Sequence, residues 1–421
     1  MILRNWPVAS VPAQPVTEVD VAIVGGGMVG ASLAAALIGS GVRALLIESV
    51  PFESAAQPSF DERTTALGNA SRRIFATLGV WEAIAPAAGV IRSIHVSDAG
   101  RFGFARLEAR EQGIEAFGYV VPNRVLGAAL WERLAREPEL TLRVPAQLSE
   151  LAIDAAGVRL GVSRPGGAPE LFQARLVVAA DGAHSQVRAA AGIGAKVEDY
   201  AQVALVANVA TEQPHADRAF ERFTRSGPLA VLPLAGGARA VIWACSPEYA
   251  ARLLALDEGA YLAELQSAFG WRAGRFTRVG RRGAYPLKLT RAAAAVGTRT
   301  VLIGNAAQAL HPVAGQGFNL GLRDAAMLAE VLAQSPAEAG CASQLERFAA
   351  WRAQDRRGVV RFTDSLVKLF GDERPGVGLL RDLGLLAFDL APPAKRALAR
   401  VSAGFAGPSP RLARGLPVRD G

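Results

Sequence analysis

The stretch VDVAIVGGGMVG, residues 19–30, decides the fold of this 421-residue chain. Its first half is typical of a buried parallel strand, and its glycines predict a tight turn into an Ala-rich helix from Met28 to about Gly39. Residues 43–47, apolar after Arg43, predict the strand that returns beside the first. Together these segments predict a βαβ unit, and hence an α/β fold built on a parallel sheet.

Gly25, Gly27 and Gly30 form a GxGxxG pattern, which is typical of a dinucleotide-binding site. Gly25 permits the tight turn, Gly27 lets backbone amides approach a pyrophosphate, and Gly30 allows close packing of helix on strand. Glu48, at the end of the second strand, is placed to accept hydrogen bonds from the adenosine ribose. The alternative is a glycine-rich packing turn without a ligand, but the flanking strand and helix favour the dinucleotide.

The composition indicates a globular protein of a reducing compartment. Hydrophobic residues make up 51% and charged residues 20%, which excludes a disordered chain. Cys245 and Cys341 are far apart without a CxxC, and four histidines offer no ligand spacing, so we expect neither a disulfide framework nor a metal site. The uncharged run 21–42 is long enough to cross a membrane, but its six glycines favour strand, turn and helix. We therefore expect a cytoplasmic, soluble protein.

Two further motifs follow predicted strands. The first is VVAADGAHSQVR, residues 177–188, and the second is VLIGNAAQALHPVAGQGFNLGLRDA, residues 301–325. In the second, a turn of small residues can contact a ribityl chain, and a glycine loop then delivers a helix that begins near Gly317. The positive end of that helix is what an anionic reduced flavin needs.

The three motifs resemble those of the flavoprotein aromatic hydroxylases of the p-hydroxybenzoate hydroxylase type, which carry GxGxxG, an Asp-Gly and a Gly-Asp motif. Residues 304–325, together with 363–370, resemble the ubiquinone-biosynthesis hydroxylases, closest to the 2-polyprenyl-6-methoxyphenol hydroxylase branch. The resemblance runs from about residue 18 to about 400. One departure is Gly304-Asn305 in place of Gly-Asp, and that branch commonly shows this Asn.

The resemblance implies a Rossmann-like FAD-binding domain with an inserted antiparallel-sheet substrate domain and a helical C-terminus. The β-rich pattern of residues 202–245 agrees with such an insertion. The expected boundaries are 18–75, 120–190 and 285–370 for the FAD-binding domain, 76–119 and 191–284 for the substrate domain, and 371–421 for a helical, basic end.

The activity that the resemblance implies is hydroxylation of a polyprenylated phenol in ubiquinone biosynthesis. NAD(P)H would reduce FAD, and O₂ would form a flavin C4a-hydroperoxide that gives its distal oxygen to the ring. No second nucleotide-binding unit is evident, so NAD(P)H would bind transiently in the same cleft. The alternatives are a hydroxylase of another phenolic metabolite and a non-catalytic flavoprotein subunit of a ubiquinone-biosynthesis complex. A nicotinamide dehydrogenase would need only the first motif.

The resemblance also assigns residues near the cofactor. They are Arg63, Arg124, Asp181, Arg188, Asn305, Gly315, Gly317 and Asn319, in addition to the three glycines and Glu48. The two arginines 63 and 124 could instead lie at the surface, and Asp181 with Arg188 could form a turn and its local ion pair. His311 and Pro312 would lie against the flavin ring, where His311 could take the phenol proton or simply be a hydrogen-bonded loop histidine.

Positive charge is concentrated at the C-terminus. Residues 394–421 hold six basic residues and one acidic residue, a net +5 of the chain's +8. Just before them, Leu379, Leu383, Leu386 and Leu390 fall on one face of a predicted helix. This combination suits docking to an anionic membrane surface or to other ubiquinone-biosynthesis proteins, and the alternative is a packed helix with a solvated tail. No nucleic-acid motif accompanies it.

Overall fold

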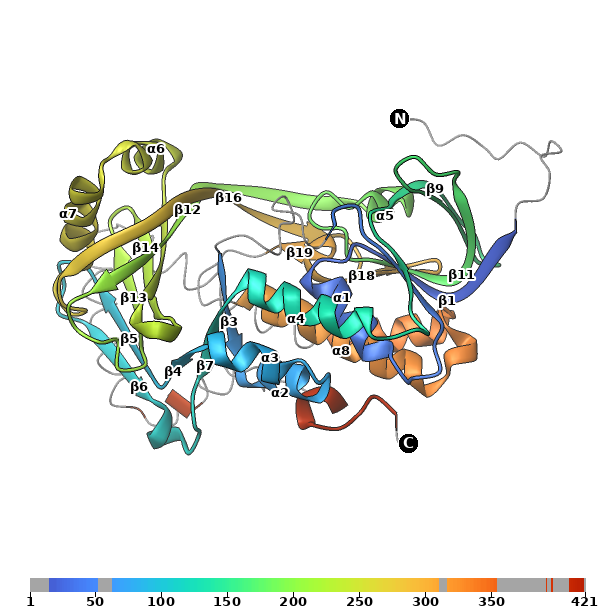
Figure 1. Cartoon of the computed structure of the whole chain (residues 1–421), viewed down its shortest axis with the longest axis horizontal. Coiled ribbons are helices and arrows are strands. Elements are labelled where there is room, and N and C mark those ends of the chain that lie inside the picture. Colours follow the sequence, from blue (N-terminus) through green and yellow to red (C-terminus); the bar gives the residue numbers. More distant parts are fainter. Residues whose placement is uncertain are drawn as a thin grey trace.

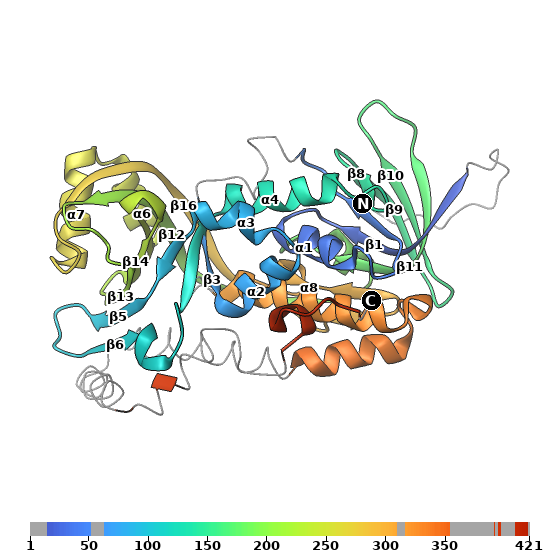
Figure 2. The same cartoon turned by 60° about the horizontal axis from the view of Figure 1, so that its bottom comes forward.

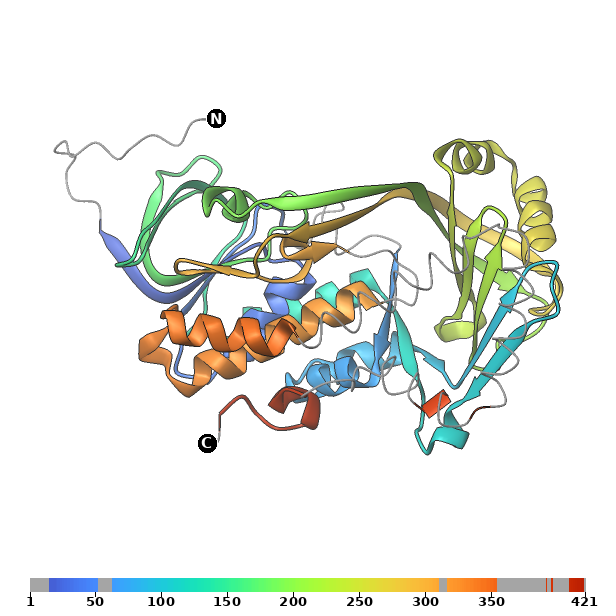
Figure 3. The same ribbon diagram turned by 180° about the vertical axis from the view of Figure 1, so that it is seen from behind.

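The computed structural model describes residues 15–51, 63–309, 316–353, 391, 395–396 and 409–419. Two large β-sheets, one at each end of the molecule, are joined by a small sheet and by two long strands (Figure 1). These strands, β12 (Ala195–Thr211) and β16 (Phe276–Ala292), run side by side along one edge of the molecule, as the view from behind shows (Figure 3).

The first large sheet has the order β17-β18-β11-β1-β2-β8, with β10 and β9 added beside β11. Its neighbours from β18 to β8 are parallel, and the last six residues of β1 are buried, as expected for a sheet covered on both faces. The strands are β1 (Val16–Val24), β2 (Ala44–Ile47), β8 (Thr141–Arg143), β9 (Gln147–Ile153), β10 (Val158–Ser163), β11 (Glu170–Ala179), β17 (Val296–Gly297) and β18 (Thr300–Leu302). The predicted βαβ unit is confirmed.

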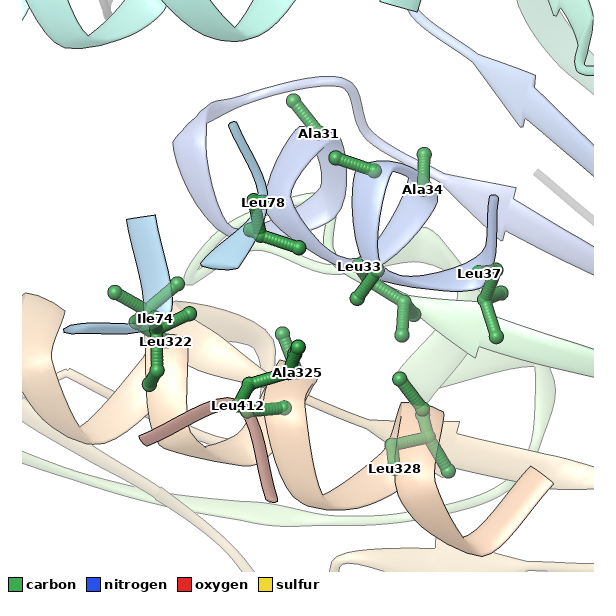
Figure 4. Packing of buried hydrophobic residues seen from close by; sticks show 14 of the residues in the cluster. Ala31, Leu33, Ala34, Leu37, Ile74, Leu78, Leu322, Ala325, Leu328 and Leu412 are labelled. Atoms are coloured by element: carbon green, nitrogen blue, oxygen red, sulfur yellow. The ribbon is translucent and has the colours of Figure 1, made fainter. Parts of the chain in front are cut away.

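Helices α1 (Met28–Leu37), α4 (Asn123–Ala135) and α8 (Gln316–Gln334) pack with this sheet. Side chains of α1, α8 and α2 (Asn69–Thr77) gather in one apolar cluster together with Leu412 (Figure 4). Residues 69–84 form two helices rather than one. Gly79 adopts a φ of 73°, which ends α2 and separates it from α3 (Trp81–Ile84).

The second large sheet has the order β19-β16-β12-β15-β14-β13-β5-β6. All neighbours in it are antiparallel except β13 and β5, so the antiparallel sheet predicted for residues 202–245 is confirmed. The other strands are β5 (Ser93–Asp98), β6 (Phe104–Glu108), β13 (Arg218–Thr224), β14 (Gly227–Pro233), β15 (Arg239–Cys245) and β19 (Gln308–Ala309). Helices α6 (Pro247–Ala255) and α7 (Glu258–Phe269) cover one of its faces.

A small antiparallel sheet lies between the two large ones. It consists of β3 (Thr64–Gly68), β7 (Gly118–Pro122) and β4 (Gly89–Ile91), in that order. The segment 76–119, expected to belong to the substrate domain, is divided: β5 and β6 join the second large sheet, whereas α3 packs against α4.

The C-terminal residues 409–419 fold back onto the first sheet's helices (Figure 2). Leu412, in the short helix η8 (Arg411–Arg414), is buried, and its carbonyl accepts a hydrogen bond from Thr77 Oγ1 at 3.1 Å. This part of the predicted solvated tail is therefore packed. Leu379, Leu383, Leu386 and Leu390, together with residues 363–370, lie outside the described residues. Residues 342–353 are helical. Within the described ranges, no helix combines the length and apolarity that crossing a bilayer requires.

Candidate active site

The three glycine-rich motifs meet at the carboxyl edge of the parallel sheet. The amide of Gly25 donates to the Ile47 carbonyl at 2.8 Å, and the amide of Ala180 donates to the Val24 carbonyl at 2.8 Å. The amide of Ile303 in turn donates to the Ala179 carbonyl at 3.0 Å. The ends of β1, β2, β11 and β18 are thus joined in one row, which is where open α/β sheets bind their ligands.

The first motif has no room for side chains at its outer glycines. A Cβ on Gly30 would lie 1.9 Å from the Gly25 carbonyl oxygen, and one on Gly25 would lie 2.5 Å from the Ala180 carbonyl oxygen. Gly25 also has a φ of 103°, which favours glycine. Gly27 is the N-cap of α1 and makes no side-chain cap, so the first amides of that helix remain available to an anion.

Glu48 stands beside this turn as predicted. Its carboxylate is buried and accepts hydrogen bonds from the amides of Gly26, at 2.6 Å, and Val50, at 2.8 Å. Ser49 Oγ donates to the same carboxylate at 3.4 Å. A carboxylate offers about four acceptor positions, so capacity remains for a ribose hydroxyl. A Cβ on Gly26 would lie 2.6 Å from the Trp131 ring, so this middle glycine is also required by packing.

Asp181 begins the second motif and lies directly against the first. One carboxylate oxygen caps helix α5 (Gln186–Ala190) by accepting from the Gln186 amide at 2.8 Å. The other, Oδ1, is buried and has no hydrogen-bond partner among the described residues. A buried carboxylate oxygen without a donor is costly, so this atom suits a hydroxyl or water supplied with a bound cofactor.

Arg188 joins the second motif to the third. Its guanidinium donates to the carbonyls of Ala183 and Ala306, both at 2.8 Å. Ala306 belongs to the short helix η5 (Gly304–Ala306), which contains the exposed Asn305. The side chain of Arg188 therefore fixes the position of the turn that the sequence predicts to face the ribityl chain.

The third motif packs on the first through glycines. Gly304 has a φ of 56°, and a Cβ there would lie 3.2 Å from the Val29 side chain. A Cβ on Gly321 of α8 would lie 3.0 Å from the Gly304 Cα. At Gly317, by contrast, a Cβ would meet no atom of the described residues within 4 Å. The first turn of α8 thus borders open space, which suits the flavin placed there by the resemblance.

Asn319 is buried and connects the start of α8 to β3 and α2. Its side-chain oxygen accepts from the Gly68 amide at 2.9 Å and from Ser71 Oγ at 2.6 Å, and its nitrogen donates to the Ala66 carbonyl at 2.7 Å. These bonds give the Asn319 side chain a positioning role in addition to any contact of its main chain with the cofactor.

The backbone segments that carry Arg63 and Arg124 lie side by side, because the Asn123 amide donates a hydrogen bond to the Arg63 carbonyl at 2.9 Å. The Arg63 guanidinium stacks on Tyr285 of β16, 4.6 Å from the ring centroid, and so joins the small sheet to the second large sheet. Arg124 is exposed in the first turn of α4. His311, Pro312 and Gly315 lie outside the described residues.

Sequence reasoning missed a buried ion pair beneath the third motif. Asp324 of α8 pairs with Arg352, and its second oxygen accepts from the Gly304 amide at 3.3 Å. The available signal was the charged residue Asp324 within the apolar periodicity of α8, which implies a buried partner.

Comparisons with known proteins agree with this site. A family model described as an FAD binding domain matches residues 18–363. The chain is 39% identical over 406 residues to "Ubiquinone hydroxylase UbiL" of Rhodospirillum rubrum, covering 95% of this chain and 93% of that protein. It is 35% identical over 393 residues to the 3-demethoxyubiquinol 3-hydroxylase of Escherichia coli, covering 92% and 98%.

The fold has solved counterparts as well. The structure of p-nitrophenol 4-monooxygenase from Pseudomonas putida superposes with a TM-score of 0.77 at 21% identity, over 93% of this chain and 99% of that one. At that identity the likeness shows the fold, which is the p-hydroxybenzoate hydroxylase type predicted from the motifs.

Fold and site together define an FAD-dependent monooxygenase with NAD(P)H as the typical co-substrate. The chain belongs to the FAD-binding-domain family and, within it, to the ubiquinone-biosynthesis hydroxylases. Its own residues fit the cofactor, because the glycine turn excludes side chains, Asp181 Oδ1 lacks a donor among the described residues, and space is open at Gly317.

Proposed function

We propose that this protein hydroxylates the aromatic ring of a polyprenylated phenol in ubiquinone biosynthesis, with NAD(P)H as the electron donor and O₂ as the oxygen donor. The supporting observation is the 39% identity, over nearly the whole chain, to a protein named as a ubiquinone hydroxylase. The meeting of all three motifs at one sheet edge supports an intact catalytic flavoprotein over a degenerate scaffold.

In this proposal Gly25, Gly27 and Gly30 hold the FAD pyrophosphate, and Glu48 holds the adenosine ribose. Asp181 accepts a hydrogen bond from a hydroxyl group or water on the pyrophosphate side of FAD, and Asn305 contacts the ribityl chain. Bound FAD supplies the redox chemistry, taking electrons from NAD(P)H and activating O₂ for transfer of one oxygen atom to the ring. The protein supplies the orientation and a positive helix end at Gly317.

His311 is proposed as the base that takes the phenol proton, with Pro312 next to it in the sequence. A phenolate attacks more readily than a phenol, and histidine titrates near neutral pH. His311→Gln should lower product formation per NAD(P)H consumed while leaving FAD content intact, with the loss confined to pH values at which the wild-type imidazole is neutral and can accept the proton. An unaltered pH profile would leave His311 with a structural role.

The decisive experiment combines cells and purified protein. Cells that lack this protein should accumulate a prenylated phenol that is one hydroxylation short. Purified holoprotein should consume NAD(P)H and convert 2-geranylphenol into a product that carries one more oxygen atom. Conversion of a different phenol alone would favour the alternative substrate class, and FAD binding without any phenol-dependent turnover would favour a non-catalytic subunit.

A prenylated substrate resides in the membrane, so we propose that the protein works as a peripheral protein on the inner face of the cytoplasmic membrane. The basic residues Lys395, Arg396 and Arg400 would face anionic lipid, each contributing about 1 kcal/mol. Because residues 409–419 are packed, replacing these three residues by Glu is a cleaner test than truncation. Sedimentation with acidic liposomes should fall, and equal sedimentation would remove the tail from the proposal. Binding to other ubiquinone-biosynthesis proteins is the competing use of this region.

A further inference from the structure

Glu221 lies in the middle of β13, within the second large sheet. Side chains alternate along a strand, and Phe220 and Arg222 point toward α7, since Phe220 packs in the cluster with Phe269 and Arg222 Nε donates to the Ala268 carbonyl at 3.2 Å. Glu221 therefore points to the opposite face. Ala219 shares that face and packs with Phe117 and Val120, next to the small sheet.

On that opposite face Glu221 is the one polar side chain in a row that crosses seven strands. The pairing registers place Val96 of β5 and Ala230 of β14 directly beside it. Beyond them the row continues in apolar residues and ends with a glycine. Its remaining members are Ala105 (β6), Ile242 (β15), Val206 (β12) and Gly283 (β16).

Four apolar members of this row are only partly covered by the described chain, whereas Ala105 at its end on β6 is buried. Val96, Ala230, Ile242 and Val206 are half-buried, although each sits within the sheet. On the other face of the same strands, Leu229, Val241 and Trp243 are fully buried beneath α6 and α7. The face that carries Glu221 thus offers an apolar surface to a molecule placed between the sheet and the FAD-binding domain.

The carboxyl group of Glu221 makes no hydrogen bond or ion pair with any described residue. Burial alone raises its pKa to about 7. Among the described residues, Asp98 of β5 is in register with Phe223, two residues along β13 from Glu221, and it forms an ion pair with Arg101 at 3.6 Å. The Glu221 side chain is half-buried like the apolar side chains beside it. A carboxyl group that lies in an apolar row without a partner among the described residues suits a ligand that donates a hydrogen bond to it.

We propose that Glu221 accepts a hydrogen bond from the hydroxyl group of the phenol substrate, while the apolar row beside it receives the ring and the first part of the prenyl chain. This inference rests on the proposed function. In its ionised form the carboxylate is purely an acceptor, and a phenol hydroxyl is a strong donor, so the two are complementary. Glu221 would thereby orient the ring as a substrate-binding residue.

The test measures binding of 2-geranylphenol to the oxidised holoenzyme by the change in flavin absorbance, at about pH 6 and about pH 8. Wild-type affinity should increase with pH, because the charged acceptor binds the hydroxyl more tightly. Glu221→Gln should weaken binding about tenfold at the higher pH and abolish the pH dependence. Glu221→Asp, which keeps a carboxylate, should retain part of the affinity.

The control is Glu212→Gln, an exposed carboxylate just beyond the end of β12 in the same sheet, which should bind the phenol as the wild type does. If Glu221→Gln retains full FAD and binds 2-geranylphenol with wild-type affinity at both pH values, the assignment of Glu221 is wrong while the proposed function stands. If the wild-type holoenzyme neither binds nor converts the phenol, the proposed function fails and the assignment fails with it.

Discussion

Asp324 and Arg352 form an ion pair in which both side chains are buried, at 3% and 1% exposure. The same carboxylate accepts from the Gly304 amide, so the pair supports the turn that carries Asn305. Arg352 also donates to the Leu320 carbonyl at 3.5 Å, within the first turns of α8. One buried pair therefore positions two parts of the third motif relative to each other.

Removing one partner of this ion pair should lower the stability of the folded protein. Arg352→Met leaves the Asp324 carboxylate buried without its counter-charge, and we expect the free energy of unfolding to fall by about 3–5 kcal/mol. FAD should also bind more weakly, because the Gly304 turn loses its support. Urea unfolding and FAD titration measure the two effects. The double variant Asp324→Leu, Arg352→Met should recover much of the stability, and a double variant as unstable as the single one would contradict this account.

Gly30→Ala should abolish FAD binding, because its Cβ would lie 1.9 Å from the Gly25 carbonyl oxygen and would displace the turn that receives the pyrophosphate. The control is Gly194→Ala, where a Cβ meets no atom within 4 Å. Flavin absorbance of the purified variants reports occupancy, and circular dichroism reports folding. A folded Gly30→Ala protein with full flavin content would refute the role given to the first motif.

Gly317→Val tests the start of α8. A side chain at residue 317 meets open space in the protein, so the apoprotein should keep its stability to within about 1 kcal/mol. The same side chain would enter the space given to the flavin, and the flavin reduction potential should fall, with slower reduction by NAD(P)H. Equal potentials in variant and wild type, both with FAD bound, would place the flavin elsewhere.

The sequence was sufficient to predict those parts of the fold and the site that depend on residues close together in the chain. The turn at Gly25–Gly30 and its flanking strand and helix depend on neighbouring residues, so their arrangement follows from spacing alone. Nothing in the sequence pairs Asp324 with Arg352 or Asn319 with Ser71, because those contacts arise when distant segments pack. For the same reason the sequence offered only membrane docking or a solvated end for the C-terminal tail, whereas Leu412 is buried against α2 and α8.

Leu412→Ala should destabilise the FAD-binding domain by about 2–5 kcal/mol, because it leaves a cavity between the C-terminal segment and the helices. Leu416→Ala is the matched control, since that leucine lies in the same segment but is 42% exposed. In thermal unfolding, the Leu412→Ala holoprotein should have a clearly lower melting temperature than the Leu416→Ala holoprotein. Equal melting temperatures would mean that the C-terminal segment contributes little to the fold.

The raised pKa of Glu221 predicts how the free energy of unfolding depends on pH. Its pKa is about 7 in the folded protein against an ordinary value of 4.5, so between these values the folded protein keeps a proton that the unfolded chain releases. Stability contributed by this group is therefore complete below pH 4.5 and is lost as the pH rises through 7. Glu221→Gln removes this loss, and the variant should be more stable than the wild type by about 2 kcal/mol at about pH 8.

Urea unfolding of both holoproteins at about pH 5 and about pH 8, with excess FAD, measures this difference. The advantage of Glu221→Gln should be several times larger at the higher pH, whereas the exposed Glu212→Gln should behave as the wild type at both. A stabilising substitution that weakens phenol binding would indicate a group kept for function at the expense of stability. A variant that is less stable than the wild type at about pH 8 would instead mean that the carboxylate has a stabilising partner in the folded protein.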